Sequence, residues 1–496
     1  MSGTLISKLS GVLREMTMAF FFGADALIAS FTVAYRISHF FRRFFAESGL
    51  GVSFIPYYES AKLKTQDRGK YFFRDLIIST LGILSVFILL SEGTLRLLIY
   101  LNISSEWTFI FQLSCILIPC IGLITLFALN QGLLQSESRF FLPAVSNIFL
   151  NFVWIGAMVL TFSHSRVFAV YVLSFAVLFG FFLQWLFTFI PVYRICKLDI
   201  KQGLLHEWGV HFKDIKKVFK SLSIAIVGVG SLQVNAVVDA ILAKIADPRG
   251  PAYLWYSIKL YQLPLSLFAI SIASALLPSL SQAFCKKDTE TYKFYLKEAI
   301  KKSLYLIIPC TFCFFPLGFF GIELIYGRGK FDLVTSYQVT HCLYAYGLGL
   351  PFASLNVILT NAFYAKKEYK TPSVFALLSV LLNLILNALF VFYFKLGAIS
   401  IAFSTSLSSL FLMVFLCLKT QEKLFDVRII IKTLITSCLS MILTYRMLFI
   451  ANYFLQRTLL LQIAKFAFFG MVFFGLYLIF DKLFDKLSNH FGRVSE

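Results

Sequence analysis

Charged residues are scarce in this chain. Only 14% of its 496 residues are Asp, Glu, Lys or Arg, whereas 59% are hydrophobic. Soluble domains contain about 25% charged and about 45–50% apolar residues. The 58 Phe residues would give a water-soluble monomer a very large exposed apolar surface. The composition therefore excludes a soluble enzyme and a disordered chain, and it indicates a protein embedded in a membrane.

The sequence also lacks the signals of two other classes. A nucleotide-driven pump needs a Gly-x4-Gly-Lys-Ser/Thr string to hold phosphates, and the Gly-Arg-Gly-Lys string at 327–330 is too short to supply it. His39 and His341 are the only histidines in the apolar segments, and neither has an acid nearby. We therefore expect a transporter rather than an enzyme, driven by an ion gradient or a membrane potential.

Fourteen segments are long and apolar enough to cross a bilayer, which takes about 20 mostly apolar residues. They leave little chain for an extramembrane domain. We therefore expect an all-α polytopic membrane protein with about 14 transmembrane helices. The predicted spans are 5–25, 27–54, 76–101, 108–135, 142–162, 167–190, 219–246, 252–282, 303–326, 335–364, 372–394, 396–418, 433–452 and 458–481.

Basic residues are distributed unevenly between the predicted loops. The loops that follow even-numbered spans, together with the C-terminal tail, contain 29 Lys and Arg residues, and the opposite loops contain six. Because basic residues accumulate on the cytoplasmic side of membrane proteins, we expect both termini in the cytoplasm. The net charge of +20 then follows from topology, and no nucleic-acid partner is expected.

Short strings recur at a nearly constant offset along the chain, which predicts two six-span halves in parallel orientation around a central cavity. Halves of this kind move against each other to give alternating access. The recurring strings are Ile55-Pro56 with Leu277-Pro278, 98–100 with 324–326, and 134–143 with 363–372. The predicted domains are an N-lobe over 1–195, a cytoplasmic linker over 196–218, a C-lobe over 219–420, and two extra helices with a tail over 421–496.

Ten basic residues fall within or at the ends of the predicted spans, and five of them lie in the first 43 positions. A Lys or Arg at the centre of a lipid-facing helix costs about 2.5–3.5 kcal/mol. We therefore expect these five side chains to face a hydrated interior. They are Lys8, Arg14, Arg36, Arg42 and Arg43.

The second predicted span carries three of these cations. Arg36, Arg43 and Glu47 fall on one stripe of a helix, and Arg43 can pair with Glu47. Arg42 lies about 100° away and has no partner on its own helix, as expected of an anion-binding residue. The alternative is that Arg42 and Arg43 extend to the cytoplasmic interface.

Cations in both halves predict a single anionic ligand. Lys8 shares a helix face with Glu15, and Arg14 lies beside Glu15. Lys259 lies in the second half, five residues before Pro264, where the helix is expected to be interrupted. A phosphate or diphosphate would suit a wet cavity lined by such groups. Ion pairs with a purely structural role are the alternative.

Two polar pairs in the second half predict a possible Na⁺ site. Asn235 and Asp239 are four residues apart on one predicted span, and Asn383 and Asn387 are four apart on another. Hard cations prefer carboxylate and amide oxygens. The alternative is hydrogen bonding between helices, for which Asn is common in membranes. No other cofactor is expected.

The chain resembles the MurJ/MviN family of lipid II flippases, in the MOP superfamily, over nearly its whole length. The strongest string is Phe-Arg-Arg-Phe-Phe-Ala-Glu at 41–47, similar to the family's LRRxFAEG motif. Together the strings are specific, whereas none is specific alone. The others are Phe54-Ile55-Pro56, Gly11 with Arg14, Leu-Leu-Pro-Ser-Leu-Ser at 276–281, Tyr-Gly-Arg-Gly-Lys-Phe at 326–331, Phe363-Tyr364 and Lys370-Thr371-Pro372.

The resemblance implies a 14-helix inner-membrane flippase. It would move lipid II, an undecaprenyl-diphosphate-linked muropeptide, to the outer leaflet for peptidoglycan synthesis and cell shape. It implies that Lys8, Arg14, Arg42 and Lys259 line the cavity and that the last two spans form a groove for the lipid tail. The implied partners are lipid II, membrane lipids and the cell-wall synthesis machinery.

The chain departs from the family pattern at several of these positions. Lys8 and Lys259 stand where Arg is usual, Glu15 where Asp is common, Gln262 where Glu can appear and Ala29 where Asp is often found. Since Lys offers a point charge rather than the bidentate hydrogen bonds of Arg, the resemblance does not decide which residue binds the diphosphate. Two other functions also stay open: another exporter of the superfamily, for drugs or lipid-linked oligosaccharides, and a non-transporting scaffold that binds the lipid precursor.

Overall fold

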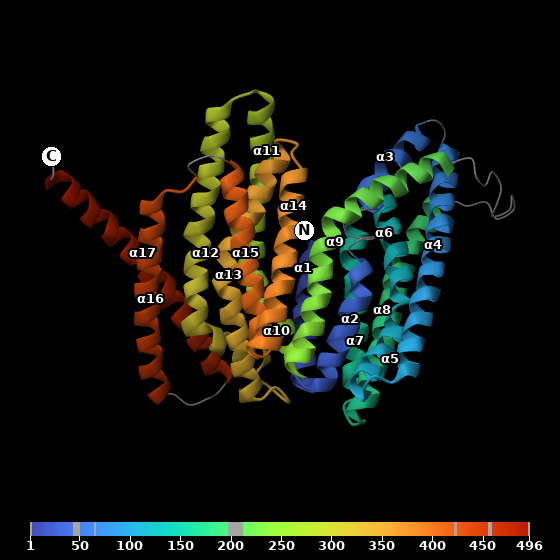
Figure 1. Ribbon diagram of the computed structural model, residues 1–496, viewed down its shortest axis with the longest axis horizontal. Helices are drawn as coiled ribbons and strands as arrows, with labels where there is room; N and C mark the ends of the chain where they lie inside the picture. Colours follow the sequence, from blue (N-terminus) through green and yellow to red (C-terminus); the bar gives the residue numbers. More distant parts are fainter. Residues whose placement is uncertain are drawn as a thin grey trace. The chain divides into compact units, whose positions relative to one another are not determined.

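The computed structural model describes residues 2–42, 50–63, 66–196, 212–420, 424–454 and 459–494, and within them it contains helices and no strand (Figure 1). Eleven helices or continuous helical runs in this part are long and apolar enough to cross a membrane. The other three predicted spans coincide with α1, with α2 and α3, and with α9. The predicted all-α polytopic fold is confirmed, with the count of 14 helices approximate.

The chain divides into two compact units, residues 1–244 and 245–496. The helices of the first unit follow one another through short turns. They are α1 (Ser2–Phe22), α2 (Ala26–Arg42), α3 (Leu50–Lys62), α4 (Gln66–Leu101), α5 (Ser105–Leu117), α6 (Cys120–Ser136), α7 (Phe141–Leu160), α8 (Arg166–Cys196) and α9 (Phe212–Ala246), whose last two residues pass the boundary.

The second unit contains eight α-helices and two π-helical segments within its described residues. They are α10 (Gly250–Pro264), η3 (Leu265–Ile270), α11 (Ser271–Cys285), α12 (Thr289–Tyr326), α13 (Leu333–Ala365), α14 (Lys370–Ala388), η4 (Leu389–Tyr393), α15 (Ile399–Thr420), α16 (Val427–Phe454) and α17 (Leu459–Val494).

Proline makes the helix irregular in two of the predicted spans. The run predicted over 108–135 consists of α5 and α6, separated at Ile118 and Pro119, because proline removes a helical hydrogen bond and clashes with the preceding turn. In the second unit, α10 ends at Pro264 and continues through η3 into α11. The expected interruption at Pro264 is therefore a wider π-helical turn, which absorbs the missing hydrogen bond without ending the span.

The helix α4 begins at Gln66, well before the span predicted over 76–101. Arg74 therefore lies inside this helix. Its side chain is 4% exposed and pairs with the fully buried Asp75, with Nη2 2.7 Å from Oδ1. A buried ion pair is tolerated where each charge has its partner.

The two units repeat the same order of helix packing. In the first unit α3 packs on α4 and α6, and α8 packs on α6 and α7. In the second unit α11 packs on α12 and α13, and α15 packs on α13 and α14. Each of these pairs has its counterpart at the offset found in the sequence. The packing therefore supports the predicted duplication.

The turns of the two units match as well. After α6, Ser138 has a left-handed φ of 58°, and at the equivalent position after α13, Lys367 has a φ of 61°. In both turns the N–H groups of this residue and the next donate to carbonyls three and five residues back. Ser104 and Asp332 also correspond in the repeat, and they cap α5 and α13 by accepting the N–H three residues on.

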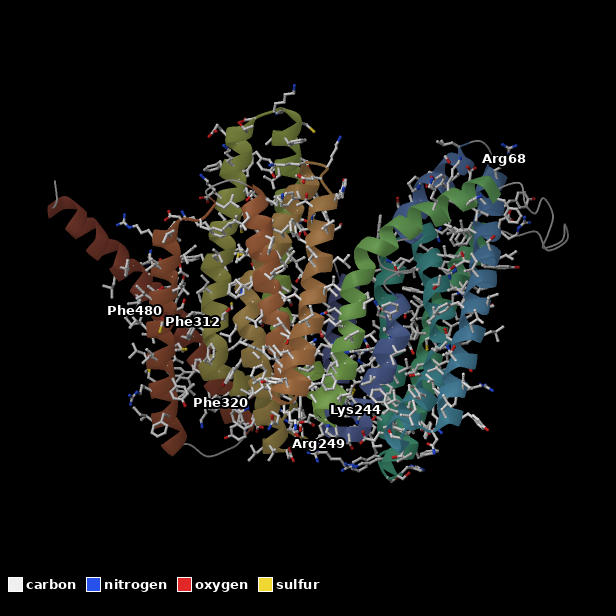
Figure 2. The ribbon with its side chains drawn as sticks, in the orientation of Figure 1. Arg68, Lys244, Arg249, Phe312, Phe320 and Phe480 are labelled. Atoms are coloured by element: carbon white, nitrogen blue, oxygen red, sulfur yellow. The ribbon has the colours of Figure 1, made fainter. Side chains whose placement is uncertain are left out.

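The helix α9 belongs to the first unit by its contacts. Lys244 is buried near its end (Figure 2), and its Nζ lies 3.3 Å from the carbonyl oxygen of Ala26 in α2. The same Nζ lies 3.6 Å from a carboxylate oxygen of Glu106 in α5. The sequence repeat assigns α9 to the predicted C-lobe over 219–420, whereas these contacts join it to the first unit. The predicted linker over 196–218 lies mostly outside the described residues and stays a prediction.

Candidate functional site

A polar cluster between α1 and α7 contains Arg14 and Glu15, two of the predicted site residues. Arg14 donates from Nη1 to Oδ1 of Asn151 at 3.1 Å and from Nη2 to Oε1 of Glu15 at 2.5 Å. Asn151 in turn donates to the hydroxyl of Ser10 at 2.8 Å. The side chains of Arg14 and Glu15 are only 12% and 7% exposed. The cation in α1 is therefore turned toward α7.

Trp154 supports the guanidinium group of Arg14. The Cζ atom of Arg14 lies 4.5 Å from the centroid of the Trp154 ring, a cation–π contact. Trp154 is fully buried and packs edge-on against Phe31 and Tyr35 of α2. Tyr35 stacks on His39 with 3.7 Å between ring centroids. These contacts link α1, α2 and α7 around the charge and hold Arg14 in one orientation.

The Nε donor of Arg14 is unused in this arrangement. It is buried and has no hydrogen-bond acceptor among the described residues, while Nη1 and Nη2 donate to Asn151 and Glu15. A buried donor without a partner carries a free-energy cost of about 1–3 kcal/mol. An anion that reaches this cluster could compete with the Glu15 carboxylate for the guanidinium group. The guanidinium group of Arg14 can therefore pair with Glu15 when no ligand is bound and with the anion when one is.

The other predicted cations of the first unit differ in their surroundings. Lys8 in α1 is exposed. Arg36 in α2 is partly buried and donates from Nη1 to the carbonyl oxygen of Ala236 in α9 at 3.1 Å. Arg42 is the last residue of α2, and its side chain lies outside the described part of the structure, as do Arg43 and Glu47. The predicted stripe on the second span is therefore visible only at Arg36.

Lys259 lies in α10, in the second unit. Its Nζ is 4.7 Å from the ring centroid of Trp255, one turn earlier on the same helix. Trp255 is itself 7% exposed. Because Lys259 and Arg14 belong to different units, the structure describes each of them separately. The aromatic support of a cation is the feature that the two residues share.

The residues of the predicted Na⁺ site form two hydrogen-bonded pairs. Asn235 donates to Oδ2 of Asp239 at 3.1 Å in α9, and Asn387 donates to Oδ1 of Asn383 at 2.8 Å in α14. Asn383 also donates to the hydroxyl of Ser408 in α15 at 3.4 Å. Oxygens of this kind suit a hard cation. The two pairs lie in separate units, so each pair is described by itself.

Asn151 and Trp154 were not predicted from the sequence. Their signal is weak, because an Asn and a Trp within an apolar span are read as helix packing or core. Their spacing, which places both on one face of α7, becomes informative only when α1 is known to pack there. Lys244 had a signal, a Lys inside an apolar run, but its partners Ala26 and Glu106 are distant in the sequence.

Comparisons with known proteins identify the family. The family model for lipid II flippase MurJ matches residues 18–473. A protein of Aquifex aeolicus named probable lipid II flippase MurJ is 30% identical over 427 residues, which cover 85% of this chain and 82% of that protein. One of Chlamydia pneumoniae with the same name is 27% identical over 425 residues, covering 86% and 76%.

A solved structure of lipid II flippase MurJ in an inward closed conformation has the same fold. It aligns with a TM-score of 0.78 and 24% identity over 98% of both chains. At this identity the likeness supports the fold alone. The family match over 18–473 and the 30% identity to the Aquifex aeolicus relative also show family membership. This multi-pass membrane chain therefore belongs to the MurJ family of lipid II flippases.

Proposed function

We propose that the protein moves lipid II from the inner to the outer leaflet of a bacterial inner membrane, for peptidoglycan synthesis. The family match over 18–473 supports this cargo. The observation on the molecule that carries the proposal is Arg14, whose side chain is only 12% exposed within an apolar span and is held by Glu15, Asn151 and Trp154. A diphosphate is the group that such a cation recognises.

In this mechanism the headgroup diphosphate takes the place of the Glu15 carboxylate on Arg14. Arg42 at the end of α2 supplies a second guanidinium group, and Lys8 and Lys259 add point charges that attract the anion without fixing its orientation. Movement of one half against the other then exposes the site to the opposite leaflet. Because Glu15 is again available to Arg14 once the lipid has left, the site returns to its resting state.

The orientation follows from the basic loops. With both termini in the cytoplasm, the basic first turns of α12 lie on the cytoplasmic side, and Tyr326 at its other end lies on the outer side. Lipid II enters from the side that is rich in Lys and Arg, where anionic headgroups are attracted. Membrane lipids and the cell-wall synthesis machinery are the remaining partners that we propose.

The first test of the site is rescue of a flippase-depleted bacterium. Arg42→Ala should abolish rescue while leaving the protein level unchanged, because the diphosphate loses a bidentate partner. Arg96→Ala is the matched control, since that side chain is 77% exposed on α4, and it should rescue growth. Growth of the Arg42→Ala strain at the wild-type rate would refute the assignment of the site.

Na⁺ is the proposed coupling ion, with Asp239, Asn383 and Asn387 as ligands. The carboxylate and amide oxygens of these side chains supply the chemistry that a hard cation needs. Asp239→Asn should remove the dependence of transport on a Na⁺ gradient, whereas Asp214→Asn, an exposed position on the same helix, should not. An unchanged response of Asp239→Asn to Na⁺ would leave the two pairs with a structural role only, as hydrogen bonds within α9 and within α14.

A further inference from the structure

A cavity of about 740 Å³ lies at one end of the second unit, between the hairpin α12–α13 and the hairpin α16–α17. Its lining comes from the last turns of α12 and α16 and the first turns of α13 and α17. The basic segment of α12 lies at the opposite end of that helix. The proposed flippase site uses none of the residues that line this cavity.

Aromatic side chains form the walls of the cavity. Phe319 of α12 and Tyr337 of α13 stack with 4.6 Å between ring centroids, and Phe315 and Tyr344 stack at 5.1 Å on the same two helices. Phe320 (Figure 2) packs on a buried apolar cluster beneath them. Stacked, half-exposed rings present a flat apolar surface to whatever enters.

Polar groups without partners also face this cavity. Within the described part of the chain, Gln462 and Lys465 of α17 make no hydrogen bond or ion pair, and the hydroxyl groups of Tyr337 and Tyr445 make none. Tyr337 and Tyr445 are 54% and 60% exposed. A groove that only held a hydrocarbon tail would not need donors of this kind. The lining therefore fits a ligand with both an apolar face and hydrogen-bonding groups.

The motif Tyr-Gly-Arg-Gly-Lys-Phe at 326–331 shapes one edge of the cavity. A Cβ atom at Gly327 would lie 2.8 Å from Oε2 of Glu323, so glycine lets the chain turn closely around this carboxylate. Tyr326 and Phe331 at the two ends of the motif pack with Tyr256 of α10. The motif is part of the family resemblance, and none of its residues belongs to the proposed diphosphate site.

The lining carries charges of both signs. Glu323 and Asp332 contribute two carboxylates and Lys465 one ammonium group, and Arg328 and Lys330 belong to the motif at the edge. A lining of mixed charge suits a neutral polar ligand. Sugar rings are uncharged, donate hydroxyl groups to carboxylates, accept from Lys and Gln, and have an apolar C–H face that packs on aromatic rings.

We propose that this cavity is a subsite for the amino-sugar rings of the cargo after they reach the outer side of the membrane. The inference rests on the proposed function for the identity of the cargo, and on the cavity itself for the class of ligand. Phe319 and Tyr337 would pack against a sugar ring, while Gln462 and Lys465 would donate to its oxygens.

Binding of di-N-acetylchitobiose, a neutral amino-sugar disaccharide, to the full-length protein in lipid nanodiscs tests this directly. Saturation-transfer NMR should give saturable binding. Tyr337→Ala should weaken it by about three- to tenfold through loss of the ring, while Tyr337→Phe stays within about twofold. Lys465→Met with Gln462→Leu should weaken it by about tenfold. Tyr295→Ala, at an exposed tyrosine of α12 that does not line the cavity, is the matched control and should bind as the wild type does.

Any of three results would overturn the proposal. One is the absence of saturable disaccharide binding to a wild-type protein that still moves lipid II. Another is binding that the cavity variants leave unchanged, and the third is a cavity that takes a polyprenyl phosphate in preference to the sugar. Disaccharide binding by a protein that fails to move lipid II would refute the proposed function and leave the sugar subsite standing.

Discussion

The α1–α7 cluster of the first unit and the α14–α15 cluster of the second show how a duplicated architecture acquires two different sites. When Pro143 is aligned with Pro372, Trp154, which supports Arg14, corresponds to Asn383, and Met158 corresponds to Asn387. The same helix positions therefore hold different groups in the two units. In α7 the ring of Trp154 packs against the Arg14 cation, whereas in α14 Asn383 and Asn387 form a hydrogen-bonded pair.

The charge on the first helix of each half, as the sequence repeat divides the chain, is also inverted between the halves. Arg14 in α1 and Asp239 in α9 are separated by an offset within the range that relates the recurring strings of the two halves. The first half thus carries a group suited to an anion, and the second a group suited to a cation. The caps and turns of the backbone are retained, so the duplication preserved the geometry while the side chains diverged.

The largest effect is expected from breaking the charged cluster. Arg14→Met removes the guanidinium group that pairs with the buried Glu15, so we expect a loss of about 3–5 kcal/mol in the free energy of unfolding, together with loss of transport. In the neutral cluster, Asn383→Leu should cost about 1–3 kcal/mol. Chemical unfolding in detergent and lipid II transport are the measurements.

The double variant Arg14→Met, Glu15→Gln separates stability from function. It should regain most of the lost stability, because no uncompensated charge remains buried, while transport stays absent. Normal transport by this variant would mean that the cluster serves the fold alone.

The close approach of α8 to α7 at Gly180 predicts the next effect, because the equivalent position of the second unit holds a larger residue. At Gly180 in α8 a Cβ atom would lie 2.8 Å from a side-chain carbon of Leu150 in α7, whereas the equivalent position in α15 is Ser409. Gly180→Ser should therefore destabilise the protein by about 1–3 kcal/mol through overpacking. Ser409→Gly should cost less. Equal costs, measured by unfolding, would contradict the closer approach of α7 and α8.

The equivalent helix caps differ in their response to pH. Hydrogen bonds from the hydroxyl and backbone N–H of Thr335 lower the pKa of Asp332, so the charged cap stabilises the fold above the ordinary pKa of Asp. This contribution disappears as the pH falls through the lowered pKa. The cost of Asp332→Asn should therefore shrink below about pH 4. Ser104→Ala should cost about 1 kcal/mol at every pH. Parallel pH profiles would contradict this account.

The smallest effect concerns the matched turns. Ser138 and Lys367 hold left-handed backbone conformations that glycine adopts without strain, so Ser138→Gly and Lys367→Gly should each stabilise the protein by up to about 1 kcal/mol. Gln135→Gly, within the last turn of α6, should destabilise it by a similar amount. Destabilisation by both turn variants in thermal unfolding would show that their side chains matter more than the backbone.

Much of the fold could be predicted from the sequence, because apolar length and loop charge report directly on what the bilayer requires. The repeat was also visible, since Pro143 and Pro372 occupy the same position in the first turns of α7 and α14. The start of α4 at Gln66 could not be predicted, because the charged residues before position 76 lie outside the apolar run that marks the span.

The candidate site could be predicted only in part. A cation inside an apolar run is costly, so Arg14 stands out in the sequence, and Glu15 is its neighbour. Asn151 and Trp154 do not stand out, because their role depends on α1 packing against α7, and that contact joins segments far apart in the sequence. The assignments of Arg42, Arg43 and Glu47 remain predictions, as does the Na⁺ site.

Transport of fluorescent lipid II across proteoliposomes tests the central claim most directly. The account predicts that wild-type protein moves lipid II between leaflets, that Arg14→Met and Arg42→Ala do not, and that exposed-site variants such as Arg96→Ala do. Transport by both the Arg14→Met and the Arg42→Ala variants at the wild-type rate, in membranes that hold the same amount of folded protein, would contradict it.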